Sequence, residues 1–145
     1  MKISIIIPTY NEEGVILECL ESLSKQSLRD FEVIVVDDGS TDQTIESIKQ
    51  LQGTNYELKL LLGKHEGAGS ARNLGAISAS GDILIFVDSD MTFDRNFVKM
   101  LIKPIVAGKT KGTFSNDEYV SNWKNVWARC YNLNEGWENK KRHQK

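Results

Sequence analysis

The sequence is poor in the residues that mark several classes of protein. Its two cysteines, Cys19 and Cys130, show no CxxC motif and no paired spacing, so we interpret them as small core or half-buried thiols of a reducing compartment. The two histidines, His65 and His143, have no partner at the spacing of a metal site or a catalytic triad. We therefore expect surface roles for both, although His65 lies near the ligand-binding cleft that the strand ends predict below.

Long apolar runs are also missing. The stretch Ile3–Ile7 stops at Pro8 and is too short for a signal-peptide core or a membrane span. No repeat and no low-complexity segment occurs. A hydrophobic content of 40% and a net charge of −2 are ordinary for a soluble globular protein and give no reason to expect nucleic acid as a partner. We expect a cytoplasmic protein, at the cytoplasmic face of the membrane if the full-length protein is attached there.

Apolar strand-like runs alternate four times with helical patterns. Each run is nearly continuous, which is typical of strands buried on both faces. This alternation predicts an α/β fold with a mostly parallel, Rossmann-like sheet and helices on both faces. The predicted strands are Lys2–Ile7, Phe31–Val36, Leu58–Leu62 and Asp82–Val87.

Three of these strands end in residues that can carry chemistry: Pro8–Asn11, Asp37–Asp38 and Asp88–Asp90. The carboxyl ends of parallel strands meet at one edge of a sheet, where such folds bind ligands. The carboxylates of Asp88 and Asp90 suit Mg²⁺ or Mn²⁺ and, through the ion, a diphosphate. The structural alternative is a polar exit from the strand, since Asp is common in turns.

The segment Asp37–Asp42 contains more acids than a turn and a helix cap require. A carboxylate there can accept a hydrogen bond from a base N–H or a ribose hydroxyl. Tyr10 is placed to stack on a base, or else is an ordinary half-buried tyrosine. We expect Asn11 to cap the first helix, with Glu12 in its first turn.

The loop Gly67–Gly75 is not a dinucleotide fingerprint. Arg72 stands where that motif needs Gly or Ala, and the loop follows the third predicted strand instead of the first. We interpret the segment Gly67–Ala79 as a helix on which Arg72 faces a phosphate. The alternative is a salt bridge from Arg72 to a nearby acid. A last predicted helix opens at Asp94 and stops around Pro104.

Four segments, in order, resemble family 2 of the inverting glycosyltransferases, which have the GT-A fold. They are Ser4–Glu12, Val35–Asp42, Gly69–Gly75 and Phe86–Asp90. The resemblance implies a nucleotide-diphosphate sugar donor, with UDP-sugar favoured, and a Mg²⁺ or Mn²⁺ ion. Its implied donor-binding residues are Pro8, Thr9, Tyr10, Glu12, Asp37, Asp38, Arg72, Asp88 and Ser89.

Within that resemblance, Asp38 would contact the nucleobase of the donor, Asp88 would contact the ribose or the metal, and Asp90 would be the main metal ligand. Family members carry an acidic catalytic base well after this motif. None of the later acids here lies in a convincing acceptor-site pattern, so the catalytic base is unassigned. We therefore expect residues 1–110 to be the nucleotide-sugar-binding domain and residues 111–145 a helical extension, together the donor part of a longer enzyme.

The tail predicts a long helix with an aromatic face. Its aromatic residues recur every four positions at Tyr119, Trp123, Trp127 and Tyr131. Beyond Asn122 the tail has six basic residues against two acidic ones. We expect the stripe to pack on the rest of the enzyme, on a second copy of the chain, or at a membrane interface.

The sequence therefore predicts metal-dependent transfer of a sugar, with inversion, from a UDP-sugar to an unknown acceptor. One alternative is a nucleotide-binding fragment without transfer activity, and another is an oligomerising interaction module. A nucleotidyltransferase is disfavoured because Pro8–Asn11 stands where such enzymes carry a Gly-rich basic loop.

Overall fold

The computed structural model describes residues 1–51 and 54–115. The chain divides into two compact units, Met1–Ile102 and Lys103–Lys145. The predicted aromatic helix around Tyr119–Tyr131 and the second cysteine lie outside the described residues. The described elements are β1 (Ile3–Thr9), α1 (Ile16–Ser24), β2 (Phe31–Asp37), α2 (Thr44–Gln50), β3 (Glu57–Leu62), α3 (Ala68–Ser78), β4 (Ile83–Phe86) and α4 (Phe97–Val106).

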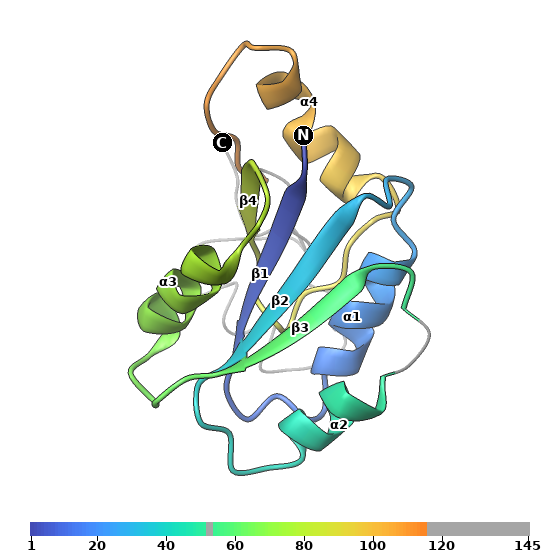
Figure 1. Cartoon of the computed structure of the whole chain (residues 1–145). Helices are drawn as coiled ribbons and strands as arrows, with labels where there is room; N and C mark the ends of the chain where they lie inside the picture. Colours follow the sequence, from blue (N-terminus) through green and yellow to red (C-terminus); the bar gives the residue numbers. More distant parts are fainter. Residues whose placement is uncertain (52–53, 116–145) are drawn as a thin grey trace, which may run out of the picture. The chain divides into compact units, whose positions relative to one another are not determined.

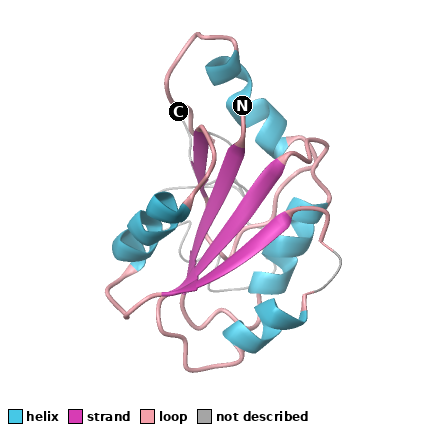
Figure 2. Cartoon of the chain, in the orientation of Figure 1, coloured by secondary structure: helices cyan, strands magenta, loops and turns pink. Residues whose placement is uncertain are grey.

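The four strands form one parallel sheet in the order β3-β2-β1-β4 (Figure 1). β1 pairs with β2 and β4, so that Ile3 lies in register with Phe31 on one side and with Ile83 on the other. Helices α1 and α2 lie on one face of the sheet and α3 on the other (Figure 2). The parallel α/β fold predicted from the alternation is confirmed. Because the strand order reverses after β3, a topological switch point lies between β1 and β4.

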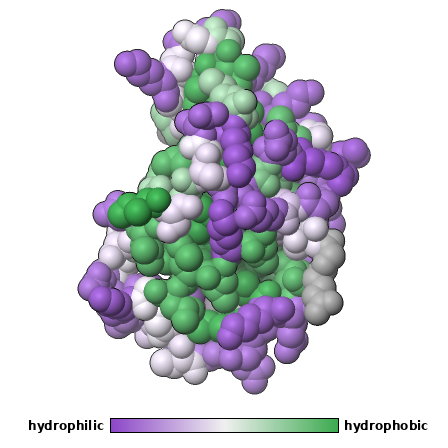
Figure 3. Space-filling view, in the orientation of Figure 1, coloured by the Kyte–Doolittle hydropathy of each residue, from purple (hydrophilic) through white to green (hydrophobic). Residues whose placement is uncertain are grey.

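Burial distinguishes the central strands from the outer ones. Every residue of β1 and β2 is buried, as predicted. The prediction that all four strands are buried on both faces is wrong for both outer strands. No residue of β3 is fully buried, and in β4 Leu84 and Phe86 are 39% and 48% exposed. The reason is that α3 packs on β1 and β2 and makes little contact with β4. In Figure 3, hydrophobic residues gather over the sheet in the middle of the view, with hydrophilic residues around them.

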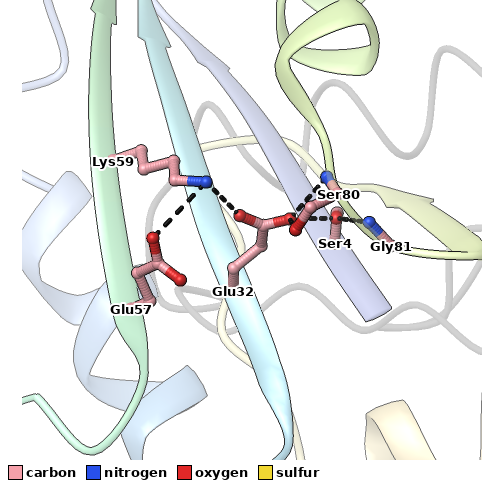
Figure 4. Close-up of polar contacts among 6 residues, drawn as sticks. All are labelled: Ser4, Glu32, Glu57, Lys59, Ser80 and Gly81. Carbon is pink, nitrogen blue, oxygen red and sulfur yellow. Dashed lines mark hydrogen bonds and ion pairs between the residues drawn. The ribbon is translucent and has the colours of Figure 1, made fainter. Parts of the chain in front are cut away.

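One buried charge interrupts the apolar strands. The fully buried carboxylate of Glu32, on β2, accepts hydrogen bonds from Ser4 Oγ at 2.6 Å and from the backbone N–H of Ser80 at 2.8 Å. Its second oxygen lies 2.7 Å from Lys59 Nζ (Figure 4). Burial by itself would raise the pKa of Glu32, but the bonds from Lys59, Ser4 and Ser80 hold that pKa well below its usual value. The carboxylate ties β1, β2, β3 and the turn before β4 together.

One predicted helix start is wrong, and one predicted helix end lies slightly short of the observed one. α1 begins at Ile16, so Asn11 does not cap it. Asn11 instead has a left-handed backbone, with φ of 54°, and its side chain bonds a neighbouring loop, as described below. α4 passes through Pro104 and ends at Val106. Proline removes one backbone donor, and the helix ends soon after it.

Candidate functional site

A cavity of about 310 Å³ opens at the carboxyl ends of β1, β2 and β4, beside the N-terminus of α3. It lies at the switch point, where doubly wound α/β sheets bind ligands. Ten residues line it: Pro8, Thr9, Tyr10, Glu12, Asp38, Ala68, Arg72, Asp88, Ser89 and Asp90. Nine of these were predicted from the sequence. The structure thus brings together residues that are up to 82 positions apart in the chain.

Arg72 spans the cavity to the end of β4. Its Nη2 atom lies 2.5 Å from Asp88 Oδ1, and both side chains are more than one third exposed. The salt bridge that the sequence left as an alternative is therefore formed in the free protein. An exposed pair of this kind contributes about 1 kcal/mol or less to stability. The salt bridge therefore holds Arg72 at the cavity but contributes little to the stability of the fold.

Asp90 and Glu12 give the cavity an excess of negative charge. Asp90 is exposed and makes no hydrogen bond or ion pair with any other residue that the structure describes. Burial, together with repulsion from Asp90 and Asp42, raises the pKa of the Glu12 carboxyl. A cation bound beside Asp90 would relieve this repulsion.

The cavity offers a metal ion only part of its ligands, so other ligands would have to come from the substrate or from water. Within residues 1–51 and 54–115, no three His, Cys, Asp or Glu side chains gather closely enough to hold an ion by themselves. Asp88 and Asp90 supply two hard carboxylates at the cavity wall. Mg²⁺ is commonly held by one or two carboxylates plus substrate phosphates and water. The two residues fit a divalent cation that arrives with a diphosphate.

Asp37 does not line the cavity. Its Oδ1 atom accepts hydrogen bonds from the backbone N–H groups of Gly39 at 3.1 Å and Ser40 at 3.0 Å, which forms the turn after β2. Gly39 has φ of 88°, a conformation that favours glycine. The Oδ2 atom of Asp37 and the Oγ1 atom of Thr9 are buried without a hydrogen-bond partner among the described residues. Asp37 and Thr9 are register neighbours on β2 and β1.

Asp38, in the cavity wall, joins three segments of the chain. Its backbone N–H donates to the carbonyl of Thr9 at 2.8 Å. Its carboxylate accepts from the backbone N–H of Glu66 at 3.0 Å and of Gly67 at 2.7 Å. The resemblance implies that the Asp38 side chain contacts the nucleobase. The same side chain also anchors the loop that leads into α3.

The loops after β1 and β2 are held together by reciprocal hydrogen bonds. They join Asn11 N to Ser40 Oγ, Thr41 N to Asn11 Oδ1, Glu12 N to Thr44 Oγ1, Glu13 N to Asp42 Oδ2, and Gln43 N to Glu13 Oε2. Asp42 also accepts from Thr44 N at 3.0 Å at the start of α2. Although burial acts in the opposite direction, the bonds that the Thr44 hydroxyl and the backbone N–H groups of Thr44 and Glu13 donate to Asp42 lower the pKa of this carboxyl. Much of the acidity of Asp37–Asp42 therefore serves to fix these loops.

His65 was predicted to lie at the surface near the cleft, and the structure places it there, exposed and beside the cavity residue Tyr10. Its imidazole packs against the Tyr10 ring, with the ring centroids 4.5 Å apart and the planes at 37°. Its Nδ1 atom lies 3.0 Å from the carbonyl oxygen of Asp38. Spacing rules for metal sites and triads could not reveal this contact. The only available signal was the position of His65 in the loop after β3.

Cys19 lies beneath the same edge of the sheet. Its thiol is buried, and its Sγ atom lies 3.8 Å from the carbonyl oxygen of Asp88. Burial, with the nearby charges of Asp90 and Asp88, raises the pKa of the Cys19 thiol to about 12. A thiol with so high a pKa is a poor nucleophile at neutral pH. Cys19 is a core residue, as predicted.

A parallel α/β sheet with helices on both faces and an open, charged crevice at its switch point is the architecture of α/β domains that bind ligands at the carboxyl ends of their strands. Comparison with known proteins gives the family. Residues 4–144 match the family described as Glycosyl transferase family 2, and the chain belongs to that family. The predicted membership is confirmed.

Two curated relatives are bacterial enzymes. The chain is 36% identical over 105 residues to Glycosyltransferase GlyA of Streptococcus pneumoniae, which covers 72% of the chain and 15% of GlyA. It is 41% identical over 102 residues to Poly(ribitol-phosphate) beta-N-acetylglucosaminyltransferase TarS of Staphylococcus aureus, which covers 68% of the chain and 18% of TarS. The chain therefore spans less than a fifth of the length of either relative.

Solved structures agree with the fold. The UDP-GlcNAc complex of S. aureus TarS 1-349 superposes with a TM-score of 0.67 at 39% identity, over 74% of this chain and 32% of that one. The mannosyltransferase PcManGT of Pyrobaculum calidifontis, solved with GDP-Man and Mn²⁺, has a TM-score of 0.67 at 31% identity, over 70% of this chain and 31% of that one. The GT-A fold predicted from the resemblance is confirmed. Among the described residues, no helix has the length and apolar character needed to cross a bilayer.

Proposed function

We propose that this chain binds a nucleotide-diphosphate sugar, with UDP-sugar favoured, and forms the donor part of an inverting glycosyltransferase. The observation that carries the proposal is the cavity that gathers Tyr10, Arg72 and Asp88–Asp90 at the switch point of the sheet. The solved complex of the relative TarS with UDP-GlcNAc supports a uridine nucleotide.

The chain's own residues have distinct parts in this proposal. The exposed ring of Tyr10 offers a surface for a base. Arg72 can exchange Asp88 for a phosphate oxygen, because a guanidinium binds either group in the same forked geometry. Asp88 and Asp90 would hold Mg²⁺ or Mn²⁺, which when bound supplies Lewis-acid neutralisation of the leaving diphosphate. Mn²⁺ in the solved complex of PcManGT supports that assignment.

We further propose that residues 1–110 are the donor-binding domain, that residues 111–145 continue the glycosyltransferase domain, and that the protein acts in the cytoplasm. In the full reaction, an acceptor hydroxyl would attack the anomeric carbon from the face opposite the diphosphate. The base that takes its proton is unassigned. The chain's share of its relatives, 15% of GlyA and 18% of TarS, favours a second candidate, a donor-binding unit that does not transfer sugar by itself.

Calorimetric titration with UDP, with and without Mn²⁺, tests the proposal. We expect binding that strengthens when Mn²⁺ is present. A folded chain that binds neither UDP nor GDP under either condition would refute donor binding. Incubation with UDP-GlcNAc and acceptors, followed by measurement of released UDP, separates the two candidates: release that depends on acceptor shows transfer, and binding without release shows a donor-binding unit.

A further inference from the structure

Two aromatic rings from distant parts of the chain meet at the rim of the cavity. Tyr10 follows β1 and His65 follows β3, and their centroids are 4.5 Å apart. This spacing lies at the short end of the range for paired aromatic rings. Tyr10 nevertheless remains 43% exposed, so the contact with His65 leaves ring surface free.

The position of His65 is fixed by its backbone and by Asp38. Its φ of 58° is left-handed, which is uncommon for a residue with a side chain. Its Nδ1 atom lies 3.0 Å from the carbonyl oxygen of Asp38, and since a carbonyl only accepts, Nδ1 carries the proton. The neighbouring Glu66 and Gly67 donate their backbone N–H groups to the Asp38 carboxylate. Three bonds to one residue therefore hold this loop.

This arrangement restricts Tyr10 from one side. Tyr10 itself lies at the end of a fully buried strand, but its ring is exposed and would otherwise sample several rotamers. A ring packed on an imidazole that is fixed in place loses less freedom when a ligand stacks on it, so binding costs less entropy.

We propose that His65 is a positioning residue: it holds the Tyr10 ring in the orientation on which the nucleobase of the donor stacks. The inference rests on the proposed function, because it assigns a part in binding the same donor. It predicts that His65 contributes to the affinity for the nucleoside part of the ligand and not for the diphosphate. His65 acts through Tyr10 and need not touch the ligand.

The test compares UDP with inorganic pyrophosphate, both titrated calorimetrically in the presence of Mn²⁺. His65→Asn removes the imidazole while tolerating the left-handed backbone. We expect about a fivefold to tenfold loss of UDP affinity, at the lower end of what stacking on one aromatic ring provides, and pyrophosphate affinity within about twofold of the original. Ile77→Ala, which changes an 84% exposed residue of α3, is the control.

Tyr10→Leu and the double variant Tyr10→Leu/His65→Asn complete the cycle. If His65 acts through Tyr10, the double variant binds UDP as weakly as Tyr10→Leu alone. Additive losses, equal losses for UDP and pyrophosphate, or an unchanged UDP affinity in His65→Asn would each overturn the inference while leaving donor binding intact. Failure of the unaltered chain to bind UDP or GDP would refute the proposed function and, with it, this inference.

Discussion

The Nη2 atom of Arg72 lies 2.5 Å from the Oδ1 atom of Asp88, so the cation at the cavity is paired with one of the two carboxylates assigned to the metal ion. A diphosphate and a divalent ion entering together would separate this pair. The phosphate would take the guanidinium, and the metal ion would take the carboxylate. The pair keeps both groups at the cavity before the ligand arrives.

Replacing Arg72 should therefore affect binding much more than stability. We expect Arg72→Ala to weaken Mn²⁺-dependent UDP binding roughly 10- to 100-fold, which corresponds to the loss of a charge-assisted hydrogen bond. The free energy of unfolding should change by less than about 1 kcal/mol, because the pair is exposed. Calorimetry and urea denaturation measure the two effects. Arg29→Ala, at an exposed position before β2, should leave UDP affinity unchanged. Equal losses in both variants would contradict a specific role.

Asp90 is expected to matter only when the metal ion is present. Asp90→Asn removes one negative charge but keeps the side-chain shape, and Asp90 has no partner to lose among the described residues. The increase in UDP affinity caused by Mn²⁺ should fall at least about tenfold, while the melting temperature should not decrease. Titrations with and without Mn²⁺ measure the difference. Asp30→Asn, another exposed acid, is the control. An unchanged Mn²⁺ effect in Asp90→Asn would remove Asp90 from the metal site.

The buried carboxylate of Glu32 predicts a dependence of stability on pH. Its pKa in the folded protein lies below the ordinary value of 4.5, so its contribution to stability is present above that value and is lost as the pH falls below it. Lys59→Met removes the group that lowers this pKa most. The variant should be less stable than the original at pH 7, and the difference should narrow towards pH 3.

Urea denaturation across this pH range measures that difference. Lys49→Met, at an exposed position on α2, removes the same charge without breaking the network and should show no comparable trend. A difference for Lys59→Met that stays constant from pH 7 to pH 3 would show that the charge of Glu32 is not the cause.

Two glycines of α3 should respond oppositely to alanine. A Cβ at Gly75 would lie 2.5 Å from Cγ2 of Ile6 and 3.2 Å from Cγ2 of Val36. Overpacking there costs about 1–3 kcal/mol, partly offset by about 1 kcal/mol of helix propensity. A Cβ at Gly69 would meet nothing within 4 Å. We expect Gly75→Ala to lower the free energy of unfolding by about 1–2 kcal/mol and Gly69→Ala to raise it slightly. The reverse order would mean that α3 does not pack this closely on the sheet.

The sheet could be predicted from the sequence because the features that indicate it are patterns of neighbouring residues. Apolar runs marked the strands, and their alternation with helices determined that the sheet is parallel. The predictions that failed concerned burial, which depends on residues that are close in space but distant in the sequence. The run Ile83–Val87 has the composition of a central strand, but burial of Leu84 and Phe86 needs a helix above them, and α3 covers β1 and β2 instead.

The same limit applies to the cavity. Motif positions predicted nine of the ten lining residues, because each lies at the carboxyl end of a strand, in the loop just after such an end, or on α3. A salt bridge from Arg72 to a nearby acid was one of the predicted alternatives, but the partners of Asp38 and Tyr10 were not predictable. That Asp38 anchors the loop through Glu66 and Gly67, and that His65 packs on Tyr10, depends on the path of a loop whose residues carry no motif.

The central place of β1 also has a consequence for the order of folding. The first strand of the chain pairs on both sides, and the bond between Lys2 N and Asp82 Oδ2 closes a loop of 80 residues. Contacts so distant in sequence form slowly, because the loop entropy is lost before the contacts can compensate for it. β1 and β2 can pair as soon as α1 separates them, whereas β4 must await most of the domain. We therefore expect the switch-point cavity to be among the last parts of the sheet to be assembled. Because β1 is central, removal of a few N-terminal residues would damage the middle of the sheet rather than an edge.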